Sequence, residues 1–266
     1  MSQFQIDGSN ALITGASAGI GREFARQLAG RASSLLLVAR RRDRLEELRD
    51  ELTGRNPNLN VQVRETDLSD ERAVIDLSDW LEREKISVDL LINNAGLGDL
   101  GMFATSEPQR VKEMLAVNVT ALTLLTRLVL PGMVARKRGA ILNVSSTAGF
   151  LPIAGFAVYA ATKAYVTSFS EAIRAELRGT GVTVTSLCPG PVPTEFTQVA
   201  TRPGARGDRS PEFVRVSAEA VARDGLAAIE RDCPLVIPGL IMKLAMFLVR
   251  ITPLSILRLA SRSYAK

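Results

Sequence analysis

The chain has 266 residues, 46% of them hydrophobic and 23% charged, a balance typical of a globular protein that buries its own core. Its two cysteines, Cys188 and Cys233, exclude a disulfide framework and favour a reducing, cytoplasmic location. The sequence contains no histidine, which excludes Ser-His-Asp triads, Cys-His dyads and His-ligated zinc. We therefore expect no metal site and assign proton transfer to other side chains.

The formal net charge of +5 is a modest basic excess. Zinc-finger spacing, an aromatic RNA-binding pattern and long basic tracts are absent from the sequence, so we expect no nucleic-acid partner. The first ten residues lack the basic and apolar segments of a signal peptide, and none is expected.

Apolar runs rich in β-branched residues alternate with longer helical patterns, which indicates βαβ units and a parallel sheet. We expect strands at Ala11–Thr14, Ser34–Ala39, Val61–Thr66, Val88–Asn93, Ala140–Val144, Val182–Leu187 and, at the edge, Leu235–Ile237. Helices are expected at Ile20–Leu28, Arg44–Leu52, Asp70–Glu84, 107–136 and Tyr159–Arg178. The helical spacing of Trp80 predicts a core residue. We predict one doubly wound α/β domain over residues 1–266, with a core of 1–237 and a tail of 238–266.

A glycine-rich turn, residues 14–21 (TGASAGIG), directly follows the first expected strand and opens the first helix. Glycines let the backbone turn tightly and approach a pyrophosphate, whose charge then meets the helix N-terminus. The turn alone is weak evidence, but a strand before it, a helix after it and further βαβ units make it a strong dinucleotide-binding signal. The cofactor-binding residues expected here are Gly15, Ser17, Ala18, Gly19, Ile20 and Gly21.

The spacing Gly-x-x-x-Gly-x-Gly resembles the TGxxxGIG fingerprint of the short-chain dehydrogenase/reductase family. Further motifs follow in the family's order: Asp67, the NNAG sequence Asn93–Gly96, Asn118, Ser146, Tyr159 with Lys163, and Pro189-Gly190. The resemblance implies a Rossmann fold with strand order 3-2-1-4-5-6-7, and a homodimer or homotetramer formed through the two longest helices. It also implies cofactor contacts from Asp67 (at the adenine), Leu68, Asn94, Ala95 and Gly96, and a nicotinamide-facing turn with Pro189, Gly190, Val192 and Thr194.

The end of the second strand indicates which dinucleotide binds. NAD-binding members carry an acidic residue there for the ribose hydroxyls, whereas this chain has Ala39 followed by Arg40 and Arg41. A carboxylate would repel a 2′-phosphate, and an arginine can clamp it through two hydrogen bonds. Because cations are unfavourable at a helix N-terminus, a merely solvated cluster is the weaker interpretation. We predict NADP(H) as the cofactor, bound by Arg40 and Arg41.

Tyr159 and Lys163 are one helical turn apart, which places both side chains on one face. A free tyrosine has a pKa of about 10, and a neighbouring ammonium and an oxidised nicotinamide would stabilise its phenolate. Ser146, at the carboxyl end of the fifth strand, can donate a hydrogen bond to the reacting oxygen. The resemblance implies that Lys163 holds the nicotinamide ribose, with Tyr159 in the same cofactor site, and that Asn118 supports a water chain to Lys163.

Neighbouring residues of the same types are interpreted as structural. Tyr165 has no lysine four positions on, so we expect it to be packed or exposed, and Ser145 is expected to cap or turn the chain. We expect Cys188 to be a buried, inert thiol, because nothing nearby in the sequence would stabilise a thiolate.

The segment between Ser146 and Tyr159 must pass close to the substrate. It carries Phe150, Leu151, Ile153 and Phe156. This apolar wall favours a lipophilic ketone or aldehyde over a sugar or polyacid. No arginine is clearly placed in the sequence to bind a substrate carboxylate.

The tail 238–266 combines apolar side chains with five cations. Lys243 and Arg250 interrupt its apolar run, so it does not predict a membrane span. A basic amphipathic helix pair could cover the substrate pocket, form a subunit contact or lie on an anionic membrane as a peripheral contact. Amphipathicity alone does not separate these three roles.

The sequence thus predicts an NADP(H)-dependent oxidoreductase that transfers hydride between nicotinamide and a carbonyl or secondary alcohol of a small lipophilic substrate. Asn118, Ser146, Tyr159 and Lys163 are its expected catalytic residues. The alternative is a catalytically silent NADP(H)-binding sensor, which would have no need of Tyr159 and Lys163 together. An extended-type epimerase or dehydratase is disfavoured, because the chain leaves little room for a sugar-nucleotide domain.

Overall fold

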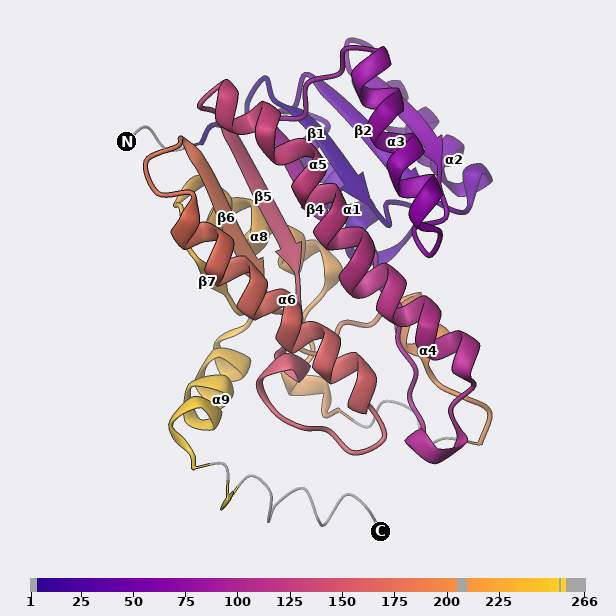
Figure 1. Ribbon diagram of the computed structural model, residues 1–266, viewed down its shortest axis with the longest axis vertical. Coiled ribbons are helices and arrows are strands. Elements are labelled where there is room, and N and C mark those ends of the chain that lie inside the picture. The colour runs from indigo at the N-terminus through magenta and orange to yellow at the C-terminus, as the bar shows by residue number, and fades with distance from the viewer. Residues whose placement is uncertain (1–3, 205–209, 254, 257–266) are drawn as a thin grey trace.

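The structure is a computed structural model that describes residues 4–204, 210–253 and 255–256. Seven parallel strands form one sheet in the order β3-β2-β1-β4-β5-β6-β7 (Figure 1). The strands are β1 Asn10–Thr14, β2 Ser34–Ala39, β3 Asn60–Glu65, β4 Leu90–Asn93, β5 Gly139–Val144, β6 Val182–Leu187 and β7 Leu235–Val236. The predicted Rossmann fold, its strand order and the position of each strand are confirmed.

Helices cover both faces of the sheet. One face carries α1 (Gly19–Leu28), α2 (Arg42–Arg55) and α8 (Ala218–Glu230), and the other carries α3 (Glu71–Arg83), α5 (Leu122–Ala135) and α6 (Ala157–Glu176). Neighbouring strand residues point to opposite faces, so Ile13 joins the first core and Leu12 the second. A strand buried on both faces must be apolar at every position, which explains the continuous run SLLLVA in β2.

Residues 108–135 form one continuous helical stretch. It consists of α4 (Pro108–Leu115), a π-helical segment (Ala116–Ala121) and α5. By length and apolar composition this stretch could cross a membrane, but it packs against α3, α6 and β5 as a core helix does. The π-helical segment widens the helix where Asn118 lies, a distortion that helices often carry at functional positions.

Helix α8 is not predicted from the sequence. Its N-cap, Ser217, accepts a hydrogen bond from the Ala220 amide, a signal that the sequence contains. Gly225 in the middle of the helix lowers its intrinsic helix propensity. In the fold this glycine permits close packing, because a Cβ there would lie 3.1 Å from Phe24 and from Leu187. Tertiary packing therefore explains a residue that local propensity disfavours.

The tail is described in part. A helix, α9, covers Leu240–Ile251, as expected for the first of two amphipathic helices. It lies below the sheet in Figure 1 and packs mainly on the short 3-10 helix Thr147–Phe150, which follows β5. Residues 257–266, where a second helix was expected, lie outside the described residues. Trp80 is packed against the second core as predicted, with the Arg64 guanidinium 5.1 Å from its ring centre.

Candidate active site

The chain changes direction across the sheet between β1 and β4, and this switch point is where open α/β sheets bind ligands. Here the glycine-rich turn links β1 to α1. Gly15 has a φ of 66°, and a Cβ on it would lie 2.8 Å from Asn94 Nδ2 and 2.9 Å from Ala95 Cα. A Cβ on Gly21 would collide with the carbonyl of Gly15. The turn is thus a bare backbone cradle at a helix N-terminus, which fits a pyrophosphate.

Hydrogen bonds between the ends of β1 and β4 hold this cradle. The Thr14 hydroxyl accepts hydrogen bonds from the amides of Asn94 and Ala95, both at 3.0 Å. In return, Asn94 Nδ2 donates to the Thr14 carbonyl at 2.8 Å. The NNAG sequence therefore fixes the glycine-rich turn from the neighbouring strand.

Arg40 and Asp67 follow β2 and β3 and both line the cleft beside the turn. The Ser69 amide and hydroxyl donate to Asp67 Oδ1 at 2.9 and 2.7 Å. Burial opposes ionisation of Asp67, but these hydrogen bonds and the nearby Arg40 guanidinium outweigh it and lower the pKa of the carboxyl. A carboxylate and a guanidinium thus lie side by side where an adenosine ribose would bind.

Arg41 and Arg44 bind a residue that the sequence analysis missed. Glu195, the first residue of α7 (Glu195–Ala200), accepts from Arg41 Nη1 at 2.9 Å and from Arg44 Nη1 at 3.0 Å. The methyl group of Thr194 approaches the turn as well, since a Cβ on Gly19 would lie 3.3 Å from it. Helix α7 therefore lies across the cleft, and Arg41 is only partly available to another anion.

Tyr159, Lys163 and Ser146 converge from α6 and the end of β5. Lys163 Nζ donates to the Val144 carbonyl at 2.8 Å and lies 5.6 Å from the Tyr159 ring centre. Ser146 accepts a hydrogen bond from the Ala148 amide at 3.1 Å, which fixes the turn after β5. Helical spacing places both α6 residues on the face toward the sheet, where all three side chains are buried.

Burial controls the protonation of this group. It raises the pKa of Tyr159 to about 12, although the hydrogen bond with Ser146 acts in the opposite direction. Burial also lowers the pKa of Lys163 to about 8. At neutral pH the tyrosine is therefore a protonated phenol, and most of the lysine still carries its charge.

Asn118 does not line the cleft, and its side chain forms hydrogen bonds with Leu97 and with Thr162, the residue before Lys163. Its Nδ2 donates to the Leu97 carbonyl at 2.9 Å and to the Thr162 hydroxyl at 3.0 Å, while its Oδ1 accepts from the Leu97 amide at 2.8 Å. A Cβ on Gly96 would lie 3.5 Å from both Asn118 Oδ1 and Lys163 Nζ. Gly96 thus keeps a narrow space open between these two polar atoms.

Tyr165 and Cys188 behave as expected from the sequence, but Ser145 does not cap the turn after β5, because Ser146 is the N-cap there. Ser145 donates to the Lys163 carbonyl at 2.7 Å and so ties β5 to α6. Tyr165 stacks on Phe169 with ring centres 5.7 Å apart and does not line the cleft. Cys188 is fully buried, and burial raises the pKa of its thiol, which keeps it protonated.

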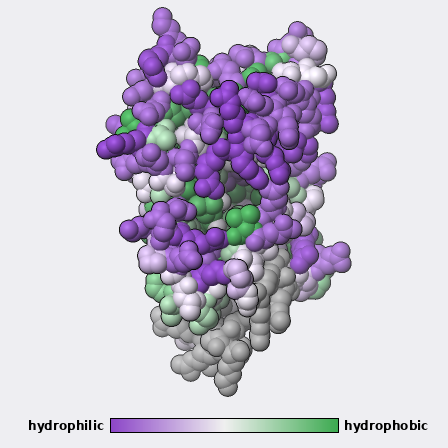
Figure 2. Space-filling view, turned by 90° about the vertical axis from the view of Figure 1, so that its right-hand side faces the viewer, coloured by the Kyte–Doolittle hydropathy of each residue, from purple (hydrophilic) through white to green (hydrophobic). Residues whose placement is uncertain are grey.

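One cleft of about 1360 Å³ joins these groups. On the face shown in Figure 2, hydrophobic surface lies recessed between hydrophilic side chains. Apart from Gly21 and Asn118, every expected site residue lines the cleft, which includes Leu68, Pro189, Gly190, Val192 and Thr194. The volume exceeds the 300–1,000 Å³ typical of sites for small ligands, so a dinucleotide and a substrate fit together.

The substrate end of the cleft is mostly apolar. Leu151, Ile153 and Phe156 line it as predicted, and the Phe156 ring stacks on Tyr159 at 4.2 Å. The prediction for Phe150 was wrong: its ring lies against α9, with the Arg250 guanidinium 5.3 Å from its centre. The 3-10 helix after Ser146 turns that side chain out of the wall. Lining residues that the sequence analysis missed are Leu100, Met102, Phe196, Val199 and Met246.

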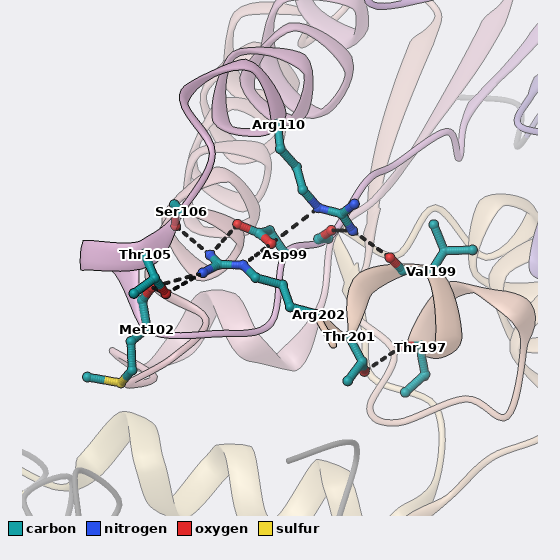
Figure 3. A network of polar contacts seen from close by, with 10 residues as sticks. Asp99, Met102, Thr105, Ser106, Arg110, Thr197, Val199, Thr201 and Arg202 are labelled. Atoms are coloured by element: carbon teal, nitrogen blue, oxygen red, sulfur yellow. Dashed lines mark hydrogen bonds and ion pairs between the residues drawn. The ribbon is translucent and has the colours of Figure 1, made fainter. Parts of the chain in front are cut away.

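An ion-pair network fastens the rim of this end (Figure 3). Asp99, with a side chain only 2% exposed, accepts from Arg202 at 2.6 and 2.5 Å and pairs with Arg110 at 3.2 Å. The Arg202 guanidinium also binds the Ser106 hydroxyl. The hydrogen bonds from Arg202 lower the pKa of the Asp99 carboxyl, and this effect outweighs burial, which acts in the opposite direction. The network joins the loop after β4 to the segment after α7, two segments that the sequence separates by about a hundred residues.

Comparison with known proteins identifies the family of this chain. A family model described as short chain dehydrogenase matches residues 9–203. The chain belongs to the short chain dehydrogenase family. In this family, the NADP-dependent 3-hydroxy acid dehydrogenase YdfG of Escherichia coli K12 is 40% identical over 191 residues, which are 71% of this chain and 75% of that protein. Helix α9 lies beyond the region that the family model matches.

Two solved structures of dehydrogenases resemble the whole fold. The Sphingobium yanoikuyae enzyme, in complex with NADPH, superimposes with a TM-score of 0.79 at 30% identity, covering 92% of this chain and 96% of that one. The bulky-bulky ketone specific alcohol dehydrogenase of Comamonas testosteroni gives a TM-score of 0.76 at 28% identity, covering 92% and 95%. Oxidoreductase activity of this chain follows from its family.

Proposed function

We propose that this chain reduces the carbonyl group of a lipophilic ketone or aldehyde with NADPH and catalyses the reverse oxidation of the alcohol, with Tyr159 as the acid/base. The observation that carries this proposal is a single cleft, lined by the glycine-rich turn and Arg40 at one end and by Ser146, Tyr159 and Lys163 further along.

NADP(H) is the cofactor that the lining residues fit. The backbone cradle of Gly15 and its neighbours would hold the pyrophosphate, and Arg40 the 2′-phosphate. Asp67 would lie at the adenosine, and Gly190 and Val192 at the nicotinamide. When bound, the nicotinamide ring supplies or accepts the hydride. The NADP dependence of YdfG and the NADPH bound by the Sphingobium enzyme support this choice.

Side chains of the protein donate and replace the proton that the reaction consumes. Tyr159, a neutral phenol because burial raises its pKa to about 12, donates its proton to the substrate oxygen during reduction. Ser146 donates a second hydrogen bond to that oxygen as negative charge develops on it. The Lys163 ammonium stabilises the phenolate that remains, and Asn118 positions the polar space from which the proton is replaced.

The wall of the cleft favours a neutral, apolar substrate body. Among the described residues that line the cleft, the cationic side chains are Arg40, Arg41 and Lys163, which belong to the cofactor end and to the proton-transfer group. Arg202 and Arg110 near the rim are both paired with Asp99. A carboxylate substrate, such as the name of YdfG indicates for that relative, would therefore find no partner on the described wall. The name of the Comamonas enzyme, specific for bulky ketones, agrees with an apolar wall.

The deciding experiment is a screen of NADPH consumption over aryl and long-chain ketones, aldehydes, steroids, quinones and 3-oxo acids. We expect turnover of neutral lipophilic carbonyls and a much lower kcat/KM for a 3-oxo acid than for its methyl ester. Preference for the free acid would refute the substrate class. Tight NADPH binding without turnover of any carbonyl would support the sensor alternative instead.

We also propose that residues 1–237 form the catalytic core and that 238–266 form a tail with a role of its own. The protein assembles as a homodimer or homotetramer through the helical stretch 108–135 and α6. It works in the cytoplasm, where its two thiols, both free in the structure, stay reduced.

A further inference from the structure

Helix α9 carries apolar side chains both on the face toward the protein and on the face turned away from it. Met242, Met246 and Arg250, spaced four residues apart, face the protein: Met246 is buried in the cleft lining, Met242 lies over Gly190, and Arg250 lies on Phe150. The opposite face is apolar and exposed. It consists of Leu240, Leu244, Phe247, Leu248 and Ile251, each 57–73% exposed.

These five residues, called the α9 apolar face below, follow the spacing i, i+4, i+7, i+8 and i+11 and so form one continuous stripe. A helix of a globular protein normally turns such a stripe toward the core. Contiguous exposed apolar surface of this kind marks a binding surface. Within the described residues, no element of the fold covers it.

Charge selects the partner. From Cys233 to Lys266 the chain carries five lysines and arginines and no aspartate or glutamate. One of them, Lys243, is exposed on α9 next to the apolar face. A second copy of this chain seated on α9 would bring two segments of like charge together, whereas a surface of anionic phospholipid offers both apolar depth and opposite charge. Twelve residues with two cations are too short and too polar to span a bilayer.

We propose that α9 docks the protein on an anionic phospholipid bilayer, with the α9 apolar face at the boundary between headgroups and acyl chains. The docked helix also forms a wall of the cleft through Met246, and Met102, 60% exposed, lines the same cleft. The mouth of the cleft therefore opens beside the lipid. If the proposed function holds, a ketone dissolved in the bilayer reaches Tyr159 from the lipid side.

Docking is tested by co-sedimentation of the full chain with vesicles of phosphatidylcholine, with and without phosphatidylserine. We expect binding that requires phosphatidylserine and falls as salt rises. Phe247→Glu with Leu248→Glu should lower the partition coefficient more than about a hundredfold, and Lys243→Glu about tenfold. The matched control is Ile75→Glu on α3, another exposed apolar residue, which should bind as the wild type does. Thermal unfolding midpoints check that each variant is folded.

Three results would overturn the proposal: no co-sedimentation of the wild type with anionic vesicles, equal binding of the double variant, or binding lost equally in Ile75→Glu. Sedimentation velocity separates the competing occupant. If the wild type is an oligomer and the double variant is a monomer, while neither protein binds vesicles, α9 is a subunit contact. None of these measurements needs NADPH or turnover. Failure of the proposed function therefore leaves the docking result unaffected, and the two failures can be distinguished.

Lipid delivery has its own readout. With a bilayer-dissolved ketone, anionic vesicles should raise the wild-type rate and should not raise that of the double variant. Both proteins should reduce a small water-soluble ketone equally, because Phe247 and Leu248 do not line the cleft. Equal rates of both proteins on the vesicle-bound ketone would refute delivery through α9.

Discussion

The cofactor end and the substrate end of the cleft are held by different kinds of interaction. At the cofactor end, short hydrogen bonds join neighbouring strands, and Gly15 and Gly21 leave no room for a side chain. At the substrate end, the Asp99–Arg202 ion pair and apolar contacts join loops and helices that are far apart in the sequence. Substitutions at the cofactor end would therefore disturb the strand ends that form it. Side chains at the substrate end can be replaced without disturbing the sheet. The predictions below test this difference, from the largest expected effect to the smallest.

Tyr159→Phe removes the proposed acid at the junction of the two ends. We expect kcat/KM for ketone reduction to fall about a thousandfold, within the range for loss of general acid catalysis, while NADPH affinity measured by fluorescence titration is retained. The control is Tyr165→Phe, which removes a hydroxyl outside the cleft. Substantial activity of Tyr159→Phe would exclude the assignment.

Asp99→Ala tests how the substrate end is held. It leaves Arg202 and Arg110 without their buried partner, and breaking a buried pair costs about 3 kcal/mol of unfolding free energy. Denaturant unfolding should show this loss, and the KM for the ketone should rise while NADPH affinity stays the same. Asp7→Ala, which removes an exposed partner of Arg31, should change stability little. An equal loss of NADPH affinity in Asp99→Ala would show that the two ends are not independent.

The pH dependence tests the junction through its lysine. Because burial lowers the pKa of Lys163 to about 8, its ammonium is lost above that pH and no longer stabilises the Tyr159 phenolate. Ketone reduction should therefore fall, by up to about tenfold per pH unit, as the pH rises above about 8. Oxidation of the alcohol needs the phenolate that this ammonium stabilises, so its rate should not rise further above about pH 8. Lys163→Met should abolish the inflection near pH 8, and a persisting inflection would assign it to another group.

Arg40→Ala tests the cofactor end. Loss of a charge-assisted contact with the 2′-phosphate should raise the KM for NADPH about tenfold and leave that for NADH nearly unchanged. The control is Arg42→Ala, whose side chain pairs with Glu46 at the surface. An unchanged KM for NADPH would remove Arg40 from the cofactor site.

Glu195→Gln should have the smallest effect. It releases Arg41 and Arg44 from an exposed ion pair, which contributes little by itself. Both guanidiniums then become available to the 2′-phosphate, so the Kd for NADPH in a fluorescence titration should fall a few-fold. A weaker affinity would show instead that Glu195 positions Arg41 for the cofactor.

The two ends also differ in how far the sequence predicts them. The strands and the cradle were predicted because their residues are contiguous or repeat with the period of a strand or a helix, whereas the order of the strands was implied by the family resemblance. A tail that covers the pocket was one of three roles open for residues 238–266, but Glu195 and Met246 were missed because no local pattern shows which side chains of α7 and α9 face the cleft. Phe150 was placed wrongly for the same reason: its neighbours in the sequence line the cleft, but one turn of 3-10 helix directs its ring to α9.

The sequence by itself determined the features on which the chemistry proposed for this protein rests. Absence of histidine, the glycine spacing of residues 14–21, Arg40 after the second strand, and Tyr159 with Lys163 are local features, and each carries its physical reason within one turn or one βαβ unit. Only the tertiary structure decided which segments enclose the substrate and which face of α9 is left to the solvent. Those outcomes depend on ion pairs and packing between segments as much as a hundred residues apart, and the local periodicity of the sequence does not indicate such contacts.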